Sequence, residues 1–206
     1  MLSPKVKIAV MVSGGGTNLQ ALIDAEKSGI IKSGKISLVL SNKADAYALK
    51  RAEAASIPVA VVEKKACADA VDFENKLIEI LDSNGIEIIV LAGFMSILSE
   101  RFTKHFSDRI INVHPSLIPS FCGKGFYGLK VHEAALEYGV KVSGATVHFV
   151  NEIPDGGKII MQKAVNVEDG DTPEILQKRI MEEAEWKILP LSCEKVCSEI
   201  LRETNR

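Results

Sequence analysis

The sequence predicts an α/β fold: a Rossmann-like open sheet, mostly parallel and flanked by helices on both faces, with an antiparallel strand pair at one edge near the C-terminus. Short apolar runs rich in Val, Ile and Leu alternate with helical patterns in the first part of the chain. These runs are almost continuous, which is typical of parallel strands buried on both faces. Two later β-rich runs are joined by a connection too short for a crossover helix, so they are expected to pair antiparallel.

The first part of the chain contains the elements of the parallel layer. Five strands are expected where apolar runs are bounded by turn residues: Val6–Val12, Lys35–Ser41, Val59–Val62, Ile86–Gly93 and Arg109–Val113. Three helices are expected between them, at residues 17–29, 44–56 and 69–85. Glycine ends the first and third of these helices, and Pro58 follows the second.

The last part of the chain contains the antiparallel pair and a long helix. The two strands are expected at Val140–Val150 and Gly157–Val167. A helix follows from Thr172 onward, with Pro173 near its start and a predicted break or kink at Pro190. No repeat, low-complexity tract or linker interrupts the pattern, so residues 1–206 are predicted to form a single domain.

Composition and charge argue against several classes of protein. The net charge of −2, with both signs interspersed, offers no basic field for a nucleic acid. No apolar run approaches the roughly 20 residues of a membrane-spanning helix, and the short apolar run near the start leads into glycines, unlike a signal peptide. The four cysteines form neither a disulfide framework nor a C-x-x-C pair. We therefore expect a cytoplasmic protein that binds neither nucleic acid nor membrane.

A glycine-rich turn, "SGGGTNLQ" (Ser13–Gln20), follows the first strand and opens the first helix. Open α/β sheets receive anions at this position, because glycines let the backbone approach a phosphate and a helix N-terminus is partly positive. The turn lacks the Gly-Lys-Ser/Thr of a Walker loop, and Leu19 occupies the third glycine position of a dinucleotide fingerprint. Two interpretations remain, a phosphate site and a tight turn that needs glycine for packing.

A second glycine motif, "GKGFYG" (Gly123–Gly128), matches the dinucleotide pattern G-x-G-x-x-G letter for letter. Its context is wrong, because it follows a proline-rich loop and not a strand. We interpret it as a flexible loop and find no support for a nicotinamide cofactor.

The stretch "RIINVHPS" (Arg109–Ser116) ends a buried-looking strand with polar side chains. If this strand is central and parallel, its carboxyl end lies where open α/β sheets bind ligands. Asn112 and His114 are two residues apart and project to one side of the strand. An amide there can hold a carbonyl oxygen, and an imidazole can exchange a proton near neutral pH. The alternative is that His114 is a hydrogen-bonded strand cap with no catalytic role.

Asp155 lies in the connection between the two late strands and is followed by two glycines. Asp-Gly is a common turn sequence, and alone it indicates only a turn. Together with Asn112 and His114 it makes a set of an amide, an imidazole and a carboxylate, which suits acyl-type transfer through a tetrahedral intermediate. Whether the carboxylate reaches the imidazole depends on the fold.

Six segments, in this order, resemble the folate-dependent formyltransferases: "SGGGTNLQALI", "SNKADAYAL", "VLAGFMSIL", "INVHPSLIP", "GATVHFVNEIPDGG" and "GDTPEIL". The similarity extends from Val6 to about Leu191. The pairing of Asn-x-His-Pro-Ser with Asp-Gly-Gly belongs to the wider family. The glycine turn and the short length resemble its glycinamide ribonucleotide branch.

The resemblance implies an enzyme that transfers formyl from 10-formyltetrahydrofolate, a cosubstrate, to the amine of N1-(5-phospho-D-ribosyl)glycinamide in purine biosynthesis, without a metal. It implies that Asn112 binds the formyl oxygen, that His114 assists proton transfer and that Asp155 raises the pKa of His114. The residues implied to hold the ribonucleotide are Gly16, Thr17, Asn18 and Glu185. The residues implied to line the folate site are Met95, Ser96, Ile97, Leu98, Asn112, Asn151, Glu152, Ile153, Pro154 and Asp155. From the residues alone, four apolar positions of this region are equally plausible as core: Leu91, Phe94, Met95 and Leu98.

The chain departs from the family pattern in three places. Ser96 stands where relatives often carry arginine, and the helix near Ala70 lacks an arginine that relatives can use on the glutamate tail of the folate. The segment Phe121–Leu136 is longer than its counterpart in some relatives, and either Lys124 or Lys130 is a candidate to supply positive charge there.

The remaining histidines and cysteines make weaker functional candidates. His148 either lines the pocket or is a hydrogen-bonded core residue, and the sequence leaves both open. His105 and His132 lie in helical, charged surroundings and are predicted at the surface. Cys193 and Cys197 are four residues apart on a helix, and without a nearby His or third Cys they are predicted to serve packing and not to bind zinc.

Three other functions are compatible with the scaffold. A formyltransferase acting on methionyl-tRNA needs an additional RNA-binding domain and a basic surplus, neither of which the sequence offers. A 10-formyltetrahydrofolate hydrolase usually has an extra N-terminal regulatory domain, whereas the first strand here begins close to residue 5. A non-catalytic folate- or nucleotide-binding protein is the alternative outside the enzymes. For the preferred function we expect small-molecule substrates and a monomer or weak homodimer.

Overall fold

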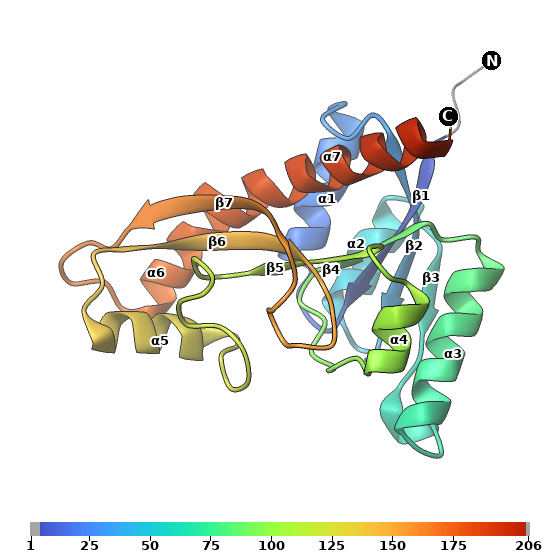
Figure 1. Cartoon of the computed structure of the whole chain (residues 1–206), viewed down its shortest axis with the longest axis horizontal. Helices are drawn as coiled ribbons and strands as arrows, with labels where there is room; N and C mark the ends of the chain where they lie inside the picture. The colour runs from blue at the N-terminus through green and yellow to red at the C-terminus, as the bar shows by residue number, and fades with distance from the viewer. Residues whose placement is uncertain (1–4, 205–206) are drawn as a thin grey trace.

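The computed structural model describes residues 5–204, which form one seven-stranded sheet with helices against its faces (Figure 1). The order of the strands is β3–β2–β1–β4–β5–β6–β7. They span Val6–Val12 (β1), Gly34–Ser41 (β2), Val59–Val61 (β3), Ile88–Leu91 (β4), Ile110–His114 (β5), Val142–Phe149 (β6) and Ile159–Asn166 (β7). The two ends of the predicted domain, residues 1–4 and 205–206, lie outside the described residues.

The pairing of the strands confirms the predicted fold class. β1 pairs in parallel with β2 and β4, and parallel pairing continues outward to β3 and β5. β6 runs antiparallel to β5, and β7 runs antiparallel to β6. The two late strands therefore extend one edge of a mostly parallel sheet, as their short connection predicts.

The helices cover two apolar clusters, one on each face of the sheet. They span Thr17–Lys27 (α1), Tyr47–Ala54 (α2), Ala70–Ser83 (α3), Glu100–His105 (α4), Leu129–Tyr138 (α5), Pro173–Ile180 (α6) and Trp186–Thr204 (α7), with a 3-10 turn at Lys64–Ala66 (η1). Ile8 and Val10 of β1 belong to a first cluster with residues of α1, α2, α6 and α7. Ala9 and Met11 belong to a second cluster with residues of α3 and α4. Alternation along β1 thus places successive side chains in opposite cores.

The C-terminal helical segment differs from the prediction at Pro190. The helix does not break there, because α7 runs through the buried proline, while a kink at Pro190 stays a prediction. The helix changes geometry earlier, where Met181–Glu185 form a π-helical turn (η2) between α6 and α7. A helix tolerates a proline where packing outweighs the lost hydrogen bond, and π turns are often found at functional sites.

Two further findings concern α7 and the other helices. Cys193 and Cys197 are fully buried in the first cluster, which confirms the packing role predicted for them. Within residues 5–204 no helix combines the length and apolar character needed to cross a membrane.

The chain changes direction across the sheet between β1 and β4. From β1 it proceeds outward through β2 and β3, and it then returns to place β4 and β5 on the other side of β1. Open α/β sheets bind ligands at the carboxyl ends of the strands beside such a switch point. At this edge lie the glycine turn after β1, the loop after β4 and the polar end of β5.

Candidate active site

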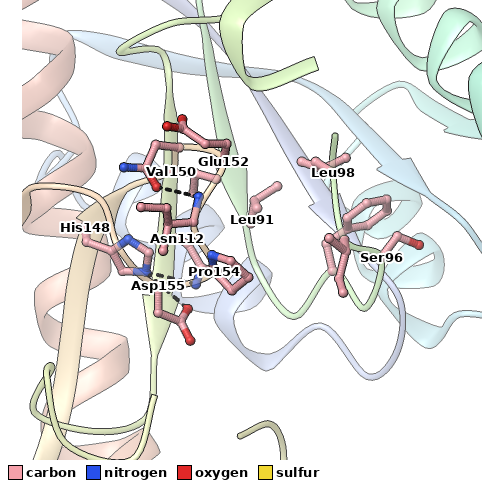
Figure 2. Close-up of a pocket in the computed structure, with 13 residues that line it drawn as sticks. Leu91, Ser96, Leu98, Asn112, His148, Val150, Glu152, Pro154 and Asp155 are labelled. Atoms are coloured by element: carbon pink, nitrogen blue, oxygen red, sulfur yellow. Dashed lines mark hydrogen bonds and ion pairs between the residues drawn. The ribbon is translucent and has the colours of Figure 1, made fainter. Parts of the chain in front are cut away.

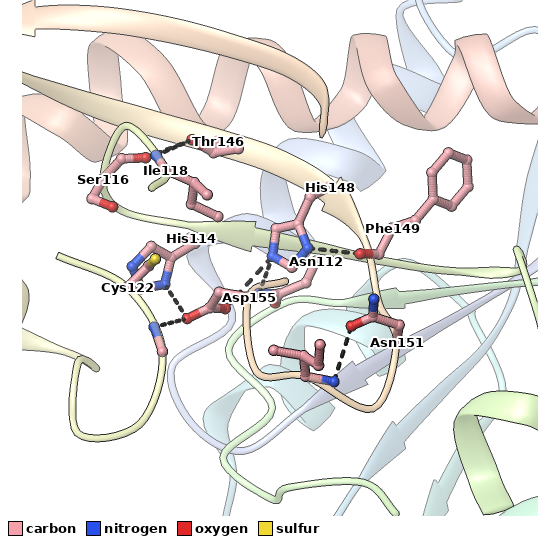
Figure 3. A network of polar contacts seen from close by, with 12 residues as sticks. Asn112, His114, Ser116, Ile118, Cys122, Thr146, His148, Phe149, Asn151 and Asp155 are labelled. Atoms are coloured by element: carbon pink, nitrogen blue, oxygen red, sulfur yellow. Dashed lines mark hydrogen bonds and ion pairs between the residues drawn. The ribbon is translucent and has the colours of Figure 1, made fainter. Parts of the chain in front are cut away.

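Three polar side chains from two distant parts of the sequence meet at the carboxyl end of β5 (Figure 3). Asn112 and His114 lie on β5, and the antiparallel register places His148 and Thr146 of β6 opposite them. Asp155 follows β6 in the connection to β7, and its φ of 57° is a left-handed value that aspartate tolerates better than most residues. The fold therefore brings Asn112, His114 and Asp155 together, while their chemical roles stay a prediction.

Asp155 lies between two imidazoles. Its Oδ2 is 3.5 Å from His114 Nδ1, and its Oδ1 is 3.6 Å from His148 Nε2. Oδ2 also accepts a hydrogen bond of 2.8 Å from the backbone N–H of Gly123. Burial raises the pKa of Asp155, but the charged forms of His148 and His114 and the Gly123 N–H together bring this pKa below its usual range. Asp155 is thus a carboxylate at neutral pH. Among residues 5–204, no group of three or more His, Cys, Asp or Glu side chains is arranged to hold a metal ion.

The side chain of Asn112 is oriented by His148. His148 Nδ1 lies 2.8 Å from the carbonyl oxygen of Phe149, which only accepts, so Nδ1 carries a hydrogen. In the neutral ring Nε2 is an acceptor, and Asn112 Nδ2 donates to it across 3.2 Å. The second N–H of Asn112 is left for a ligand. His148 is both buried and part of a cavity wall, so each of the two interpretations left open by the sequence holds.

His114 is buried, with an acceptor near each ring nitrogen. Nε2 lies 2.8 Å from the carbonyl oxygen of Phe121, and Nδ1 faces Asp155. Burial lowers the pKa of His114 by more than Asp155 and the Phe121 carbonyl raise it, so this pKa lies below its ordinary value. Asp155 thus acts in the direction that the resemblance implies, and burial outweighs it.

The segment after β5 is held in place by polar side chains of β6 and β7. Thr146 Oγ1 donates to the carbonyl oxygen of Ser116 at 2.7 Å and accepts from the N–H of Ile118 at 3.1 Å. Gln162 Nε2 donates to the carbonyl oxygen of Ile118 at 3.0 Å. These bonds fix the turn that follows His114, and with it the backbone carbonyl that His114 contacts.

A cavity of about 150 Å³ lies between the loops that follow β4 and β6 (Figure 2). We call it the smaller cavity. Nine of the residues implied to bind folate line it: Ser96, Ile97, Leu98, Asn112, Asn151, Glu152, Ile153, Pro154 and Asp155. Met95, the tenth, lines the adjoining cavity instead. Leu91 and Phe94 line the smaller cavity and also pack in the second cluster, so they serve both pocket and core.

The adjoining cavity, of about 850 Å³, is called the larger cavity. Asn112 and Asp155 line both cavities, so the two spaces meet at these residues, and His114 lines the larger one. Asn18 of α1 and Glu185 of the π turn also line the larger cavity, and Asn18 Nδ2 donates to Glu185 Oε2 at 2.7 Å. Burial raises the pKa of Glu185, although the bond from Asn18 acts in the opposite direction.

The other two residues implied to hold the ribonucleotide do not line the larger cavity. Gly16 has a φ of 73°, and a Cβ there would lie 2.6 Å from Ala48 Cβ, so the turn needs glycine in order to pack against α2. Thr17 lines a third cavity, of about 190 Å³. At Gly14 and Gly15 no atom lies within 4 Å of where a Cβ would stand, so the backbone there is open to a ligand. The turn therefore combines a packing glycine with two accessible ones.

The segment Gly123–Gly128 is a loop, as its sequence context predicts. It borders the larger cavity, and Lys124 is the only cationic side chain among the described residues that line this cavity. Lys130, the other candidate for positive charge, instead lies with Nζ 4.7 Å from the ring centre of Tyr127. Of the two candidates for positive charge, Lys124 therefore lines the larger cavity and Lys130 does not.

The prediction that His132 lies at the surface is wrong. His132 is on α5, which packs against α6, and its side chain is fully buried at the wall of the larger cavity. Burial, with a smaller effect from His114, lowers the pKa of His132 to about 4. His105 is at the surface as predicted, where its ring lies 3.0 Å from Asp82.

Comparison with known proteins identifies the family. The profile of the formyl transferase family matches residues 6–192. The chain belongs to this family, which agrees with the resemblance of its motifs.

Curated relatives and solved structures agree with this assignment. Phosphoribosylglycinamide formyltransferase of Haemophilus influenzae is 45% identical over 185 residues, which are 90% of this chain and 84% of that protein. The trifunctional purine biosynthetic protein adenosine-3 of Gallus gallus is 45% identical over 94% of this chain, but the chain spans only 19% of its length. The crystal structure of glycinamide ribonucleotide transformylase 1 from Symbiobacterium toebii matches with a TM-score of 0.88 at 40% identity, covering 95% of this chain and 89% of that one. The predicted fold is thus confirmed.

Proposed function

We propose that the protein transfers a formyl group from 10-formyltetrahydrofolate to the amine of N1-(5-phospho-D-ribosyl)glycinamide, a step of purine biosynthesis. One observation carries the proposal: Asn112, His114 and Asp155 of this chain lie close together near the junction of two cavities. The chain is also similar to a protein named phosphoribosylglycinamide formyltransferase. A reaction between two substrates needs such a junction, because both reacting atoms must be held in contact. We assign the folate to the smaller cavity and the ribonucleotide to the larger one.

The smaller cavity suits a flat, largely apolar ring system. Ile97 and Ile153 on its wall are 81% and 59% exposed, and large apolar side chains exposed together often mark a binding site. The loop after β4 is anchored, because Asn42 Nδ2 donates to Ser96 Oγ at 2.9 Å. Ser96, which replaces an arginine of some relatives, thus supports the wall of the folate site. Bound there, 10-formyltetrahydrofolate supplies the formyl group.

Asn112 stabilises the negative charge that develops on the formyl oxygen. When the amine nitrogen bonds to the formyl carbon, one electron pair of the C=O bond moves onto oxygen. The free N–H of Asn112 donates to this oxygen, and its contact with His148 fixes the direction of the donor beforehand.

His114 moves the proton that the reaction must transfer. The attacking amine becomes positive and loses a proton, and the folate nitrogen gains one as its bond to carbon breaks. The Phe121 carbonyl keeps a hydrogen on Nε2, so the atom of His114 that exchanges the proton is Nδ1. The lowered pKa leaves Nδ1 free at neutral pH, and Asp155, 3.5 Å away, stabilises the imidazolium between the two transfers.

The phosphate of the ribonucleotide is assigned to the glycine turn and Lys124. α1 has no acidic residue in its first turn, so its N-terminus is suited to an anion. Gly14 and Gly15 leave room for a phosphate to approach the backbone. Lys124 adds positive charge from the loop Gly123–Gly128, which borders the larger cavity, and a lysine–phosphate contact is a strong charge-assisted bond.

Incubation of the purified protein with both substrates tests the proposal. Formylated ribonucleotide should appear, by mass spectrometry, in step with the loss of formyl folate. Formyl released to water alone would indicate a 10-formyltetrahydrofolate hydrolase of the same family, and no loss of formyl folate would indicate a binding protein. Methionyl-tRNA in place of the ribonucleotide should remain unmodified.

A further inference from the structure

The imidazole of His132 has no hydrogen-bonding partner in the described part of the chain. Its side chain is fully buried, and both Nδ1 and Nε2 are unpartnered. Buried polar groups are nearly always hydrogen-bonded, because the bonds to water that burial removes must be replaced. An unpartnered ring at a cavity wall therefore marks a place where a ligand or a water completes the bonding.

His132 shares the larger cavity with a second unpartnered atom. Asn18, which lines the same cavity, has a buried Oδ1 without a partner, while its Nδ2 is engaged by Glu185. Gln177 of α6 adds a further amide to this wall. Side chains from α1, α5, α6 and the π turn, all with hydrogen-bonding groups, thus line one space.

The charge of this wall decides which chemical group fits it. The low pKa of His132 makes the ring neutral at pH 7, so it offers one donor and one acceptor. A hydroxyl or an amide group also both donates and accepts, and it matches such a ring. A phosphate only accepts, so it matches only the donor of such a ring, and it is better placed beside Lys124.

We propose that His132 is a substrate-binding residue that hydrogen-bonds a hydroxyl or amide group of the ribonucleotide. The inference rests on the proposed function, because that function supplies a sugar and an amide between the phosphate and the reacting amine. It adds to the glycine turn and Glu185 a side chain from α5.

Two substitutions of His132 and one of His105 test the inference. His132→Leu removes both nitrogens and should raise the KM for the ribonucleotide about ten- to hundredfold, leaving the KM for formyl folate unchanged. His132→Gln keeps a donor and an acceptor and should recover part of the loss. His105→Leu, at the surface and outside both cavities, should change neither KM.

Thermal unfolding of the unliganded variants separates substrate binding from a structural role. His132→Leu should keep or raise the Tm, because an apolar side chain replaces polar atoms that lack partners. A lowered Tm with an unchanged ribonucleotide KM would overturn the inference, and so would an unchanged KM alone, since water would then satisfy the ring. Failure of the unmodified protein to formylate the ribonucleotide would instead reject the proposed function.

A measurement on the unmodified protein does not depend on the folding of any variant. In a long-range ¹H–¹⁵N spectrum of the histidine side chains, adding glycinamide ribonucleotide should shift the ring nitrogens of His132. Tetrahydrofolate should leave them in place. Ring nitrogens that do not respond to a saturating concentration of ribonucleotide would overturn the inference.

Discussion

The two cavities that meet at Asn112 differ in what lines them. The smaller one lies largely between two loops and carries the exposed apolar side chain of Ile153. The larger one is walled in part by buried polar side chains held on helical segments, including His132 and Glu185. The free energy of an apolar contact grows with the area buried, whereas the free energy of a buried polar group depends on whether its one hydrogen-bonding partner is present. Substitutions at the junction and in the larger cavity should therefore change kcat or KM by a larger factor than substitutions in the smaller cavity.

The junction should show the largest effect. His114→Ala should lower kcat by about 10²–10⁴-fold, because the proton then lacks an acceptor, while the Kd of the ribonucleotide changes little. Initial rates and calorimetric titration measure the two quantities, with His105→Ala as the surface control. If the affinity for the ribonucleotide fell by the same factor as kcat, His114 would have a structural role. The junction would then show no larger effect on catalysis than the two cavities.

The next largest effect is expected at Asp155. Its negative charge favours the imidazolium of His114, so Asp155→Asn should lower the pKa of His114 further and reduce kcat by about 10²-fold. If neutral His114 is the active form, activity is lost as pH falls through its pKa. The acidic limb of the kcat profile should then move to lower pH in the variant. An acidic limb that stays in place or moves to higher pH would contradict the electrostatic contact between Asp155 and His114.

Lys124 tests the polar character of the larger cavity. Lys124→Met should raise the KM for the ribonucleotide about tenfold, because one charge-assisted bond to phosphate is lost, and it should weaken the dependence of this KM on salt. The KM for formyl folate should stay the same. Lys130→Met is the matched control, since Lys130 contacts Tyr127 and does not line the cavity. Equal effects of the two substitutions would leave Lys124 without its assigned role.

The smallest effect is expected at the apolar wall of the smaller cavity. Ile153→Ala should raise the KM for formyl folate only about three- to tenfold, in proportion to the apolar area removed from the contact. The stability of the unliganded protein should not change, because the side chain is already exposed. Ile30→Ala removes an exposed isoleucine outside both cavities and should have no effect on either KM. A hundredfold effect at Ile153 would contradict the contrast between the two cavities.

The sequence predicts features that depend on local pattern. Apolar runs and their connections predict the sheet, including the antiparallel edge made by β6 and β7. The polar end of β5 predicts a ligand site at Asn112 and His114, because the carboxyl ends of parallel strands face such sites. Asp155 was placed beside them by resemblance, and the structure puts its carboxylate 3.5 Å from the ring.

Features that depend on packing between distant segments were missed. His132 shares a helix face with the buried Val131 and Ala135, a signal in the sequence, but its burial follows from the packing of α5 on α6. The pKa of His114 falls because burial outweighs a neighbouring charge, and the extent of burial is not a local property. The π turn that brings Glu185 to Asn18 has no simple sequence signal.

A crystal structure with glycinamide ribonucleotide and a non-reactive analogue of formyl folate would show whether the two substrates meet at Asn112 and His114. The oxygen equivalent to the formyl oxygen should lie about 3 Å from Asn112 Nδ2, with the ribonucleotide amine beside His114 Nδ1. The two ligands should enter from the two cavities. An amine that lies outside the junction, or an Asn112 amide that contacts neither ligand, would contradict this arrangement.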